Sequence, residues 1–205
     1  MDISVIVPCH NLEKYIQPLL NSLSSQSLYS GVSAEVIFVL DNCTDKTEEI
    51  ISEWIERNGR LNPSIIKVNV HSCGLARNAG LLRARGNWIW FVDGDDWIMS
   101  SDAFSILVDY AYFTNAHYIH FQFDYPETFK FPTHPAMVWQ YLFDRNTLAN
   151  LRFTDIQPHE DKLFMEAYSA QWGPPVLLHD QLYYYNYGRE GSNIQQFLEK
   201  GRIDQ

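Results

Sequence analysis

The sequence predicts an α/β fold in which a mainly parallel central sheet is flanked by helices. Short apolar runs rich in β-branched and aromatic residues alternate with segments whose apolar residues recur at helical spacing. This alternation indicates right-handed βαβ crossovers, which pair the strands in parallel. The strands are expected at 3–8, 34–40, 65–70 and 87–92. Helices are expected between them at 12–26 and 72–86, and the segment 41–57 is expected to be a polar loop that opens another helix.

Cap residues support these helices. Asn11 is a natural N-cap for the first helix, and Ser72 is one for the third. Gly86 is expected to end the third helix.

The alternation of strands and helices becomes less regular after residue 97. No internal repeat or linker is visible in the 205 residues, so we expect a single domain with an elaborated second half. Helices are expected at 102–113, 137–151 and 160–171, strands at 116–123 and 176–188, and a proline-containing loop at 124–135.

Polar clusters follow the end of each of the first four strands. They are "CHN" (9–11), "DNCTD" (41–45), "HSCG" (71–74) and "DGDD" (93–96). The carboxyl ends of parallel strands meet at one edge of an open sheet, which is where ligands bind. We therefore expect these four clusters to form one site.

The "DGDD" cluster places Asp93, Asp95 and Asp96 side by side with no Lys or Arg between Arg85 and Lys130. A solvated polar loop is one interpretation. A calcium loop of the EF-hand type does not fit, because its ligands alternate over 12 residues. The third interpretation is a divalent-metal site shared with a phosphorylated ligand, since Mg²⁺ and Mn²⁺ prefer oxygen ligands.

Composition limits the partners. With 15 Lys and Arg against 25 Asp and Glu, the net charge of −10 argues against a broad basic face for nucleic acid or an anionic membrane. No apolar stretch reaches the roughly 18 residues of a membrane span, so membrane contact would be peripheral at most.

The first strand leaves no room for a signal peptide, and Cys9, Cys43 and Cys73 are expected to be reduced thiols that pack in the protein interior. We expect a cytoplasmic protein.

Five segments then carry a family resemblance. "SVIVPCHNLEKYI", "EVIFVLDNCTDKTEEII", "GLARNAGLLRARGNWIWFVDGDDW", "HEDKLF" and "YYYNYGREGS" occur in this order, which resembles the motif order of the inverting family-two glycosyltransferases. The resemblance implies a GT-A type fold, with residues 1–97 as the nucleotide-binding half and 98–205 as the acceptor-side half. It also implies transfer of a sugar, with inversion, from a nucleotide-diphosphate donor of UDP type to an acceptor hydroxyl.

The resemblance also implies roles for the acidic loop. Asp95 would hold Mn²⁺ or Mg²⁺, Asp93 would face the ribose or the metal, and Asp96 would support them. Gly94 would allow a tight turn that brings the backbone near the nucleotide. His179 is a further metal candidate, although a lone His beside a strand is more often structural.

Other motif positions match the family's nucleotide contacts. Asp41 corresponds to the acid that contacts the base, and Arg77 to an arginine near the nucleotide, unless Arg77 is simply a surface helix residue. The remaining candidates for the nucleotide and its diphosphate are Pro8, His10 and Asn11 after the first strand, and Arg189 and Ser192 in the tail.

The catalytic base would come from "HEDKLF". The resemblance favours Asp161 as the base, with Glu160 orienting it or binding the acceptor. Adjacent acids at a helix start also act as partners of the helix dipole, which is the alternative. Tyr125 and Trp172 are candidates for the floor of an acceptor site, because aromatic faces cover sugar rings.

Two departures from the family bear on donor choice: Leu40-Asp41 replaces a common Asp pair, and an Arg often found near Tyr187 is missing. The acceptor could be a glycan, a lipid-linked saccharide or another hydroxyl compound. Two other functions stay open. One is a sugar-1-phosphate nucleotidyltransferase, which would normally carry a Gly-rich basic loop where this chain has "PCHNLEKY". The other is a non-catalytic nucleotide-sugar binding module.

Overall fold

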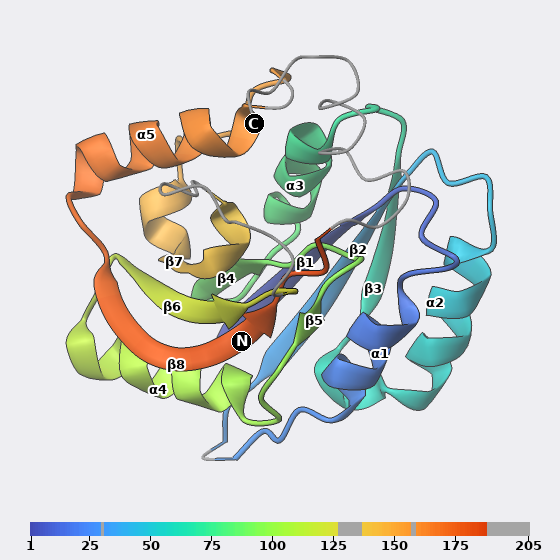
Figure 1. Ribbon diagram of the computed structural model, residues 1–205, viewed down its shortest axis with the longest axis horizontal. Coiled ribbons are helices and arrows are strands. Elements are labelled where there is room, and N and C mark those ends of the chain that lie inside the picture. Colours follow the sequence, from blue (N-terminus) through green and yellow to red (C-terminus); the bar gives the residue numbers. More distant parts are fainter. Residues whose placement is uncertain (30, 127–136, 157–158, 188–205) are drawn as a thin grey trace.

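The computed structural model describes residues 1–29, 31–126, 137–156 and 159–187. They form three layers, with helices on both faces of one curled sheet (Figure 1). The strands are β1 (Ile3–Cys9), β2 (Ala34–Asp41), β3 (Ser64–Val68), β4 (Trp88–Phe91), β5 (Trp97–Ile98), β6 (Tyr118–Asp124), β7 (Tyr141–Asp144) and β8 (Val176–Tyr184).

The helices fill the connections between these strands. Within the described residues, the first half carries three α-helices and the second half two, with short 3₁₀ turns near β3 and around β7. Their bounds are α1 (Gln17–Ser24), α2 (Thr47–Arg57), α3 (Cys73–Leu81), α4 (Ala103–Thr114), α5 (Glu160–Trp172), η1 (Gly59–Leu61), η2 (Val138–Gln140) and η3 (Arg145–Leu148).

The eight strands are ordered β3-β2-β1-β4-β7-β6-β8-β5. β3, β2, β1 and β4 are mutually parallel, and β6 pairs in parallel with β8. β7 is antiparallel to both β4 and β6, and β5 is antiparallel to β8. The predicted α/β class with a mainly parallel sheet is confirmed.

Strand alternation divides the core between the two faces of the sheet. Val5 and Trp90 face one side with the buried residues of α1, α2 and α4. Ile6 and Phe91, their neighbours in sequence, face the other side with α3 and α5 (Figure 1). Because β1, β2 and β4 are buried on both faces, their sequences are nearly all apolar rather than alternating.

The predicted first helix is wrong over its first turn. Asn11 is not an N-cap; its φ is 52° and its side-chain oxygen accepts the Thr44 backbone N–H at 2.8 Å. The next backbone N–H, of Leu12, donates to the Thr47 hydroxyl at 2.6 Å. These contacts tie the segment after β1 to the β2–α2 loop, so α1 begins only at Gln17.

The helix predicted at 137–151 is also wrong. The structure has the turn η2, the strand β7 and the turn η3 there. Leu142 packs on one face of the sheet and Phe143 on the other, which is strand periodicity. Pairing with β4 and β6 on both sides outweighs the helical propensity of this segment.

Smaller features match the prediction only in part. Ser72 caps α3 as predicted, its hydroxyl accepting the Leu75 backbone N–H at 3.5 Å. The helix ends at Leu81 rather than at Gly86. The three cysteines are free, as expected. No helix within the described residues is long and apolar enough to cross a membrane.

Gly86 is required for packing rather than for ending a helix. A Cβ there would lie 2.5 Å from the Ser4 backbone nitrogen and 2.6 Å from the Ile3 carbonyl carbon. The Gly86 N–H also donates to the Ser4 hydroxyl at 2.7 Å. The chain therefore crosses β1 at a distance that excludes a side chain.

We predict that Gly86→Ala lowers the free energy of unfolding by about 1–3 kcal/mol, because β1 backbone atoms would have to move. Gly59→Ala is the matched control, since a Cβ at Gly59 meets nothing within 4 Å. Urea unfolding of both variants measures the difference, and equal stability of the two would contradict the packing argument.

Candidate active site

The carboxyl ends of the parallel strands bring the predicted clusters together. His10, after β1, lies with its Nδ1 2.6 Å from the backbone oxygen of Asp41, at the end of β2. The carboxylate of Asp41 accepts backbone N–H groups of Val70 and Ser72 at 2.8 and 3.0 Å. Three loops are therefore joined by direct hydrogen bonds.

Asp41 is 5% exposed, and both of its oxygens are used within the protein. Its side chain fixes the β3–α3 loop and thus the start of the helix that carries Arg77. Its predicted contact with a nucleotide base stays a prediction, and any such contact would share an oxygen with these N–H groups.

Arg77 is the centre of the site. It lies on α3, is 2% exposed, and its guanidinium contacts two carboxylates from distant parts of the chain. Nη2 donates to Asp93 Oδ1 at 2.8 Å, and Nη1 donates to Asp161 Oδ1 at 2.6 Å. Glu160 Oε1 lies 3.9 Å from Nη1, and the guanidinium carbon lies 5.4 Å from the centre of the Phe153 ring. Arg77 is therefore not a surface helix residue.

Burial governs the charges in this cluster. Burial raises the pKa of Asp161 to about 7, although Arg77 opposes this increase. Burial alone would lower the pKa of Arg77, but Asp161, Asp93 and Glu160 raise it well above its ordinary value. Arg77 is therefore a fixed positive charge, while Asp161 takes up and releases a proton near neutral pH.

Asp161 lies in the first turn of α5, where its second oxygen accepts the backbone N–H of Val138 at 3.2 Å. Glu160 is the less anchored acid: its Oε2 is buried without a hydrogen-bond partner within the described part of the chain. Gly74 lies close to it: a Cβ there would lie 3.3 Å from Glu160 Cγ, and still closer, at 2.9 Å, to Phe153 Cβ. Both predicted acids thus face the start of α3.

The three aspartates of "DGDD" have different surroundings. Asp96 is 1% exposed; it accepts the Tyr183 hydroxyl at 2.6 Å and the Asn186 backbone N–H at 2.8 Å. The Asp93 backbone N–H donates to the same Tyr183 hydroxyl at 3.1 Å. The Asn186 side chain donates to the Asp95 carbonyl at 3.1 Å. Asp96 therefore fastens the acidic loop to the end of β8.

The carboxylates that suit a divalent cation are those of Asp93 and Asp95. Asp96 already uses both of its oxygens, and burial together with Asp95 and Asp93 raises its pKa well above the ordinary value. No group of three or more His, Cys, Asp or Glu side chains within the described residues is arranged to hold a metal. Two carboxylates nevertheless fit Mg²⁺ or Mn²⁺ when substrate phosphates complete the coordination.

Gly94 packs closely against the segment after β1. A Cβ there would lie 2.4 Å from Leu12 Cδ1 and 3.3 Å from the Pro8 carbonyl oxygen. Its φ is outside the left-handed region, so close approach, rather than an unusual turn conformation, accounts for the glycine. This contact joins the acidic loop to the loop of His10 and Asn11.

The other predicted residues lie apart from this cluster or outside the described part of the chain. His179 is exposed in an irregular stretch of β8, between the pairs Phe121–Leu178 and Gln122–Gln181, and four residues before Tyr183. Arg189 and Ser192 lie outside the described residues.

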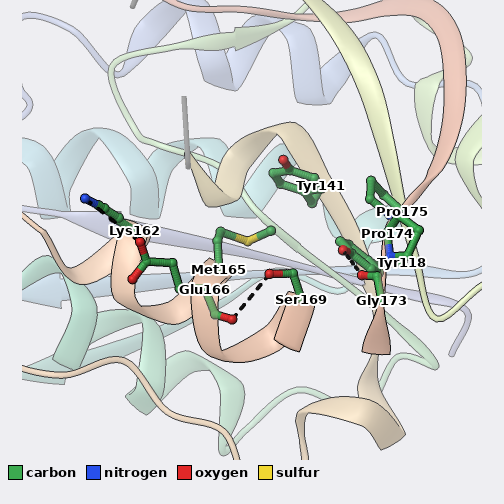
Figure 2. Close-up of a pocket in the computed structure, with 9 residues that line it drawn as sticks. All are labelled: Tyr118, Tyr141, Lys162, Met165, Glu166, Ser169, Gly173, Pro174 and Pro175. Atoms are coloured by element: carbon green, nitrogen blue, oxygen red, sulfur yellow. Dashed lines mark hydrogen bonds and ion pairs between the residues drawn. The ribbon is translucent and has the colours of Figure 1, made fainter. Parts of the chain in front are cut away.

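A hollow of about 690 Å³ lies beside α5 (Figure 2). Lys162, which follows Asp161 directly in the sequence, is at one end of the hollow, Pro174 and Pro175 are at the other, and Tyr141 of β7 lies between them. Tyr125 and Trp172, the predicted acceptor-side aromatics, are not among its described lining residues. The complete lining is Tyr118, Tyr141, Lys162, Met165, Glu166, Ser169, Gly173, Pro174 and Pro175.

Sequence reasoning missed Val138, Phe153, Tyr183 and Asn186. Tyr183 and Asn186 belong to "YYYNYG", whose polar groups beside buried rings were the available signal. Val138 acts through its backbone N–H, which leaves no trace in the identity of the side chain.

The chain is similar to known proteins along most of its length. The family model for glycosyl transferase family 2 matches residues 4–169. The poly(ribitol-phosphate) β-N-acetylglucosaminyltransferase TarS of Staphylococcus aureus is 38% identical over 118 residues, which are 58% of this chain and 20% of TarS. Glycosyltransferase GlyA of Streptococcus pneumoniae is 40% identical over 98 residues, 47% of this chain and 13% of GlyA. Each match spans a fifth or less of the relative.

Solved structures share the fold. TarS residues 1–349 from S. aureus in complex with UDP-GlcNAc give a TM-score of 0.84 at 26% identity, covering 95% of this chain and 61% of that one. The mannosyltransferase PcManGT of Pyrobaculum calidifontis, in complex with GDP-Man and Mn²⁺, gives 0.75 at 17% identity, covering 99% and 65%. The second likeness bears on the fold alone. The predicted GT-A type fold is confirmed.

We predict that Tyr183→Phe lowers the free energy of unfolding by about 1–3 kcal/mol, because Asp96 and the Asp93 N–H lose a buried partner. Tyr184→Phe is the matched control: the neighbouring ring stacks on Trp97 at 4.0 Å. Denaturant unfolding compares the two variants. If both are as stable as the original protein, the Tyr183 hydroxyl does not hold the acidic loop.

Proposed function

The chain belongs to glycosyl transferase family 2, and from this premise we propose that it transfers a sugar from a nucleotide-diphosphate donor to an acceptor hydroxyl, with inversion at the anomeric carbon. The observation that carries the proposal is the pair of carboxylates on Arg77. Asp161 and Asp93 accept from the same guanidinium at 2.6 and 2.8 Å. A base candidate and the acidic donor loop therefore meet at the carboxyl edge of the sheet, where nucleotides bind in α/β folds.

In the proposed reaction, the acceptor oxygen attacks the anomeric carbon as the bond from that carbon to the diphosphate oxygen breaks. The acceptor proton passes to the Asp161 carboxylate, and the nucleotide diphosphate leaves with the bonding electrons. A base with a pKa of about 7 suits this step, because about half of it is ionised at neutral pH and the ionised form accepts a proton readily. The bonds from Arg77 and Val138 hold its oxygens in fixed directions.

Glu160 is the second candidate in the "ED" pair. We assign it to acceptor binding, because its Oε2 is buried with no partner within the described residues and can accept from a hydroxyl. Asp161 is the preferred base, since it has the direct contacts to Arg77 and Val138.

Asp93 and Asp95 would hold a divalent cation, which would neutralise charge developing on the diphosphate. The chain's own part is to hold these carboxylates in place. Arg77 fixes Asp93, and Asn186 fixes the backbone at Asp95. The hydrogen bond from the Tyr183 hydroxyl to Asp96 anchors the same loop to β8.

For the donor we propose a UDP-sugar, since the TarS structure that shares this fold at 26% identity contains UDP-GlcNAc. For the acceptor we propose a hydroxyl of a glycan or a polyol phosphate, because the curated relatives include poly(ribitol-phosphate) glycosyltransferases. The hollow beside α5 is lined by Lys162, which follows Asp161 in the sequence, and we propose it as a candidate acceptor path (Figure 2). A screen of nucleotide sugars by thermal shift, followed by donor hydrolysis with Mn²⁺, tests the donor class.

Asp161→Asn should lower sugar transfer by about 10²–10⁴-fold while UDP binding survives, because the amide keeps the shape but accepts no proton. The rate of sugar transfer is measured with an acceptor that the original protein glycosylates, and UDP binding is measured by calorimetric titration. Transfer near the original rate would refute Asp161 as the base.

With UDP present, addition of Mn²⁺ should raise the melting temperature of the original protein. Asp95→Asn should abolish this increase, because one of the two carboxylates that would bind the cation is lost. Asp180→Asn, in an exposed part of β8, is the control and should keep the increase. If the Asp95 variant still responds to Mn²⁺ as the original protein does, the proposed metal site is wrong.

A further inference from the structure

A single buried guanidinium connects the proposed base to the donor loop. We propose that Arg77 is a positioning residue, which keeps Asp161 ionised and aligned for proton abstraction and ties this alignment to the acidic loop through Asp93. The inference rests on the proposed function, in which Asp161 takes the acceptor proton. It differs from the nucleotide contact that the family resemblance implied for Arg77.

The geometry suits an arginine and no other cation. Nη1 and Nη2 of one planar group contact different carboxylates, at 2.6 Å to Asp161 and 2.8 Å to Asp93. The Phe153 ring lies against the guanidinium, with 5.4 Å between ring centre and Cζ. A lysine ammonium is a point charge on a flexible stem, and it lacks the rigid fork that fixes both acids at once.

Arg77 also dominates the charges that face Asp161. The other titratable groups that act on Asp161 are the Cys73 thiol on α3, Glu160 on α5 and Asp93 in the acidic loop. Glu160 and Asp93 are negative and disfavour ionisation of Asp161, as burial does. Among the described residues, Arg77 is the one cation within ion-pair distance of Asp161. Without it, the base would carry a proton at the pH where it must accept one.

The contact with Asp93 adds a dependence on the donor side. Asp93 lies at the end of β4, and its backbone is held by the Tyr183 hydroxyl. If the acidic loop moved, Arg77 would lose one of its two anchors and Asp161 would lose its alignment. One of the two contacts that hold the base therefore depends on the loop that would receive the diphosphate, while the other comes from the Val138 backbone.

The test compares Arg77→Gln and Arg77→Lys with Arg85→Lys as the matched control. Arg85 forms an ion pair of the same length, 2.8 Å to Glu35, but its side chain is largely exposed and lies outside the proposed machinery, so it controls for the general effect of an arginine-to-lysine change. For Arg77→Gln we expect kcat to fall about 10²-fold or more. We also expect the acid limb of the kcat–pH profile to move upward by about 1–3 pH units. Arg77→Lys should lower kcat while it keeps the acid limb near its original position. The Arg85 control should behave as the original protein does.

Two outcomes overturn the inference. One is an unmoved acid limb in Arg77→Gln, and the other is a raised donor KM with kcat unchanged, which would mark a simple nucleotide contact. If Arg77→Gln does not fold, Arg77→Lys decides: a kcat at least about tenfold lower, with the acid limb kept, supports positioning, and an unchanged kcat refutes it.

A measurement without turnover separates this inference from the proposed function. The ¹³C resonance of the Asp161 carboxyl, assigned by its absence in Asp161→Asn, reports the pKa of Asp161 directly. We expect Arg77→Gln, or Arg77→Met if that variant folds better, to raise this pKa by about 1–3 units. An unchanged titration sinks the inference even if the protein transfers sugar. If the original protein transfers no sugar but Arg77→Gln raises the pKa of Asp161 as expected, only the proposed function is refuted.

Discussion

The arrangement of the site depends on compensation of buried charge. Arg77 is 2% exposed, and taking a cation out of water is costly unless carboxylates surround it. Asp93 comes from the end of β4 and Asp161 from the start of α5, 68 positions later in the chain. The requirement to neutralise Arg77 therefore draws the acidic loop, α3 and α5 to one point. Removing any one of the three charges leaves the others unbalanced in a largely buried environment.

The three aspartates of the acidic loop make different contacts. Asp96 is directed inward, where Tyr183 and Asn186 satisfy it. Asp93 is directed to Arg77, and Asp95 has its backbone carbonyl held by the Asn186 amide. A cluster of like charges is tolerable here because one member is embedded in hydrogen bonds and a second is paired with a cation. The three carboxylates are therefore compensated differently: Asp96 by hydrogen bonds within the protein, Asp93 by Arg77, and Asp95, together with Asp93, by the proposed divalent cation.

Periodicity predicted the parallel half of the sheet well. β1, β2 and β4 read as continuous apolar runs because they are buried on both faces, and the polar clusters that follow β1, β2 and β3 meet through hydrogen bonds to His10 and Asp41. The segment 137–151 was mispredicted because its pairing partners lie far away in sequence. The contact between Arg77 and Asp161 could not be foreseen, since α3 and α5 approach each other only in the folded chain.

The sheet runs without interruption through both predicted halves of the chain. β4 lies in the half predicted to bind the nucleotide and β7 in the half predicted to bind the acceptor, yet they are adjacent antiparallel strands, with Trp88 opposite Asp144 and Trp90 opposite Leu142. A hinge rotation that separated the halves would have to break these hydrogen bonds. Any opening of the proposed site would therefore have to come from loops at the edge of the sheet rather than from a hinge between the two halves.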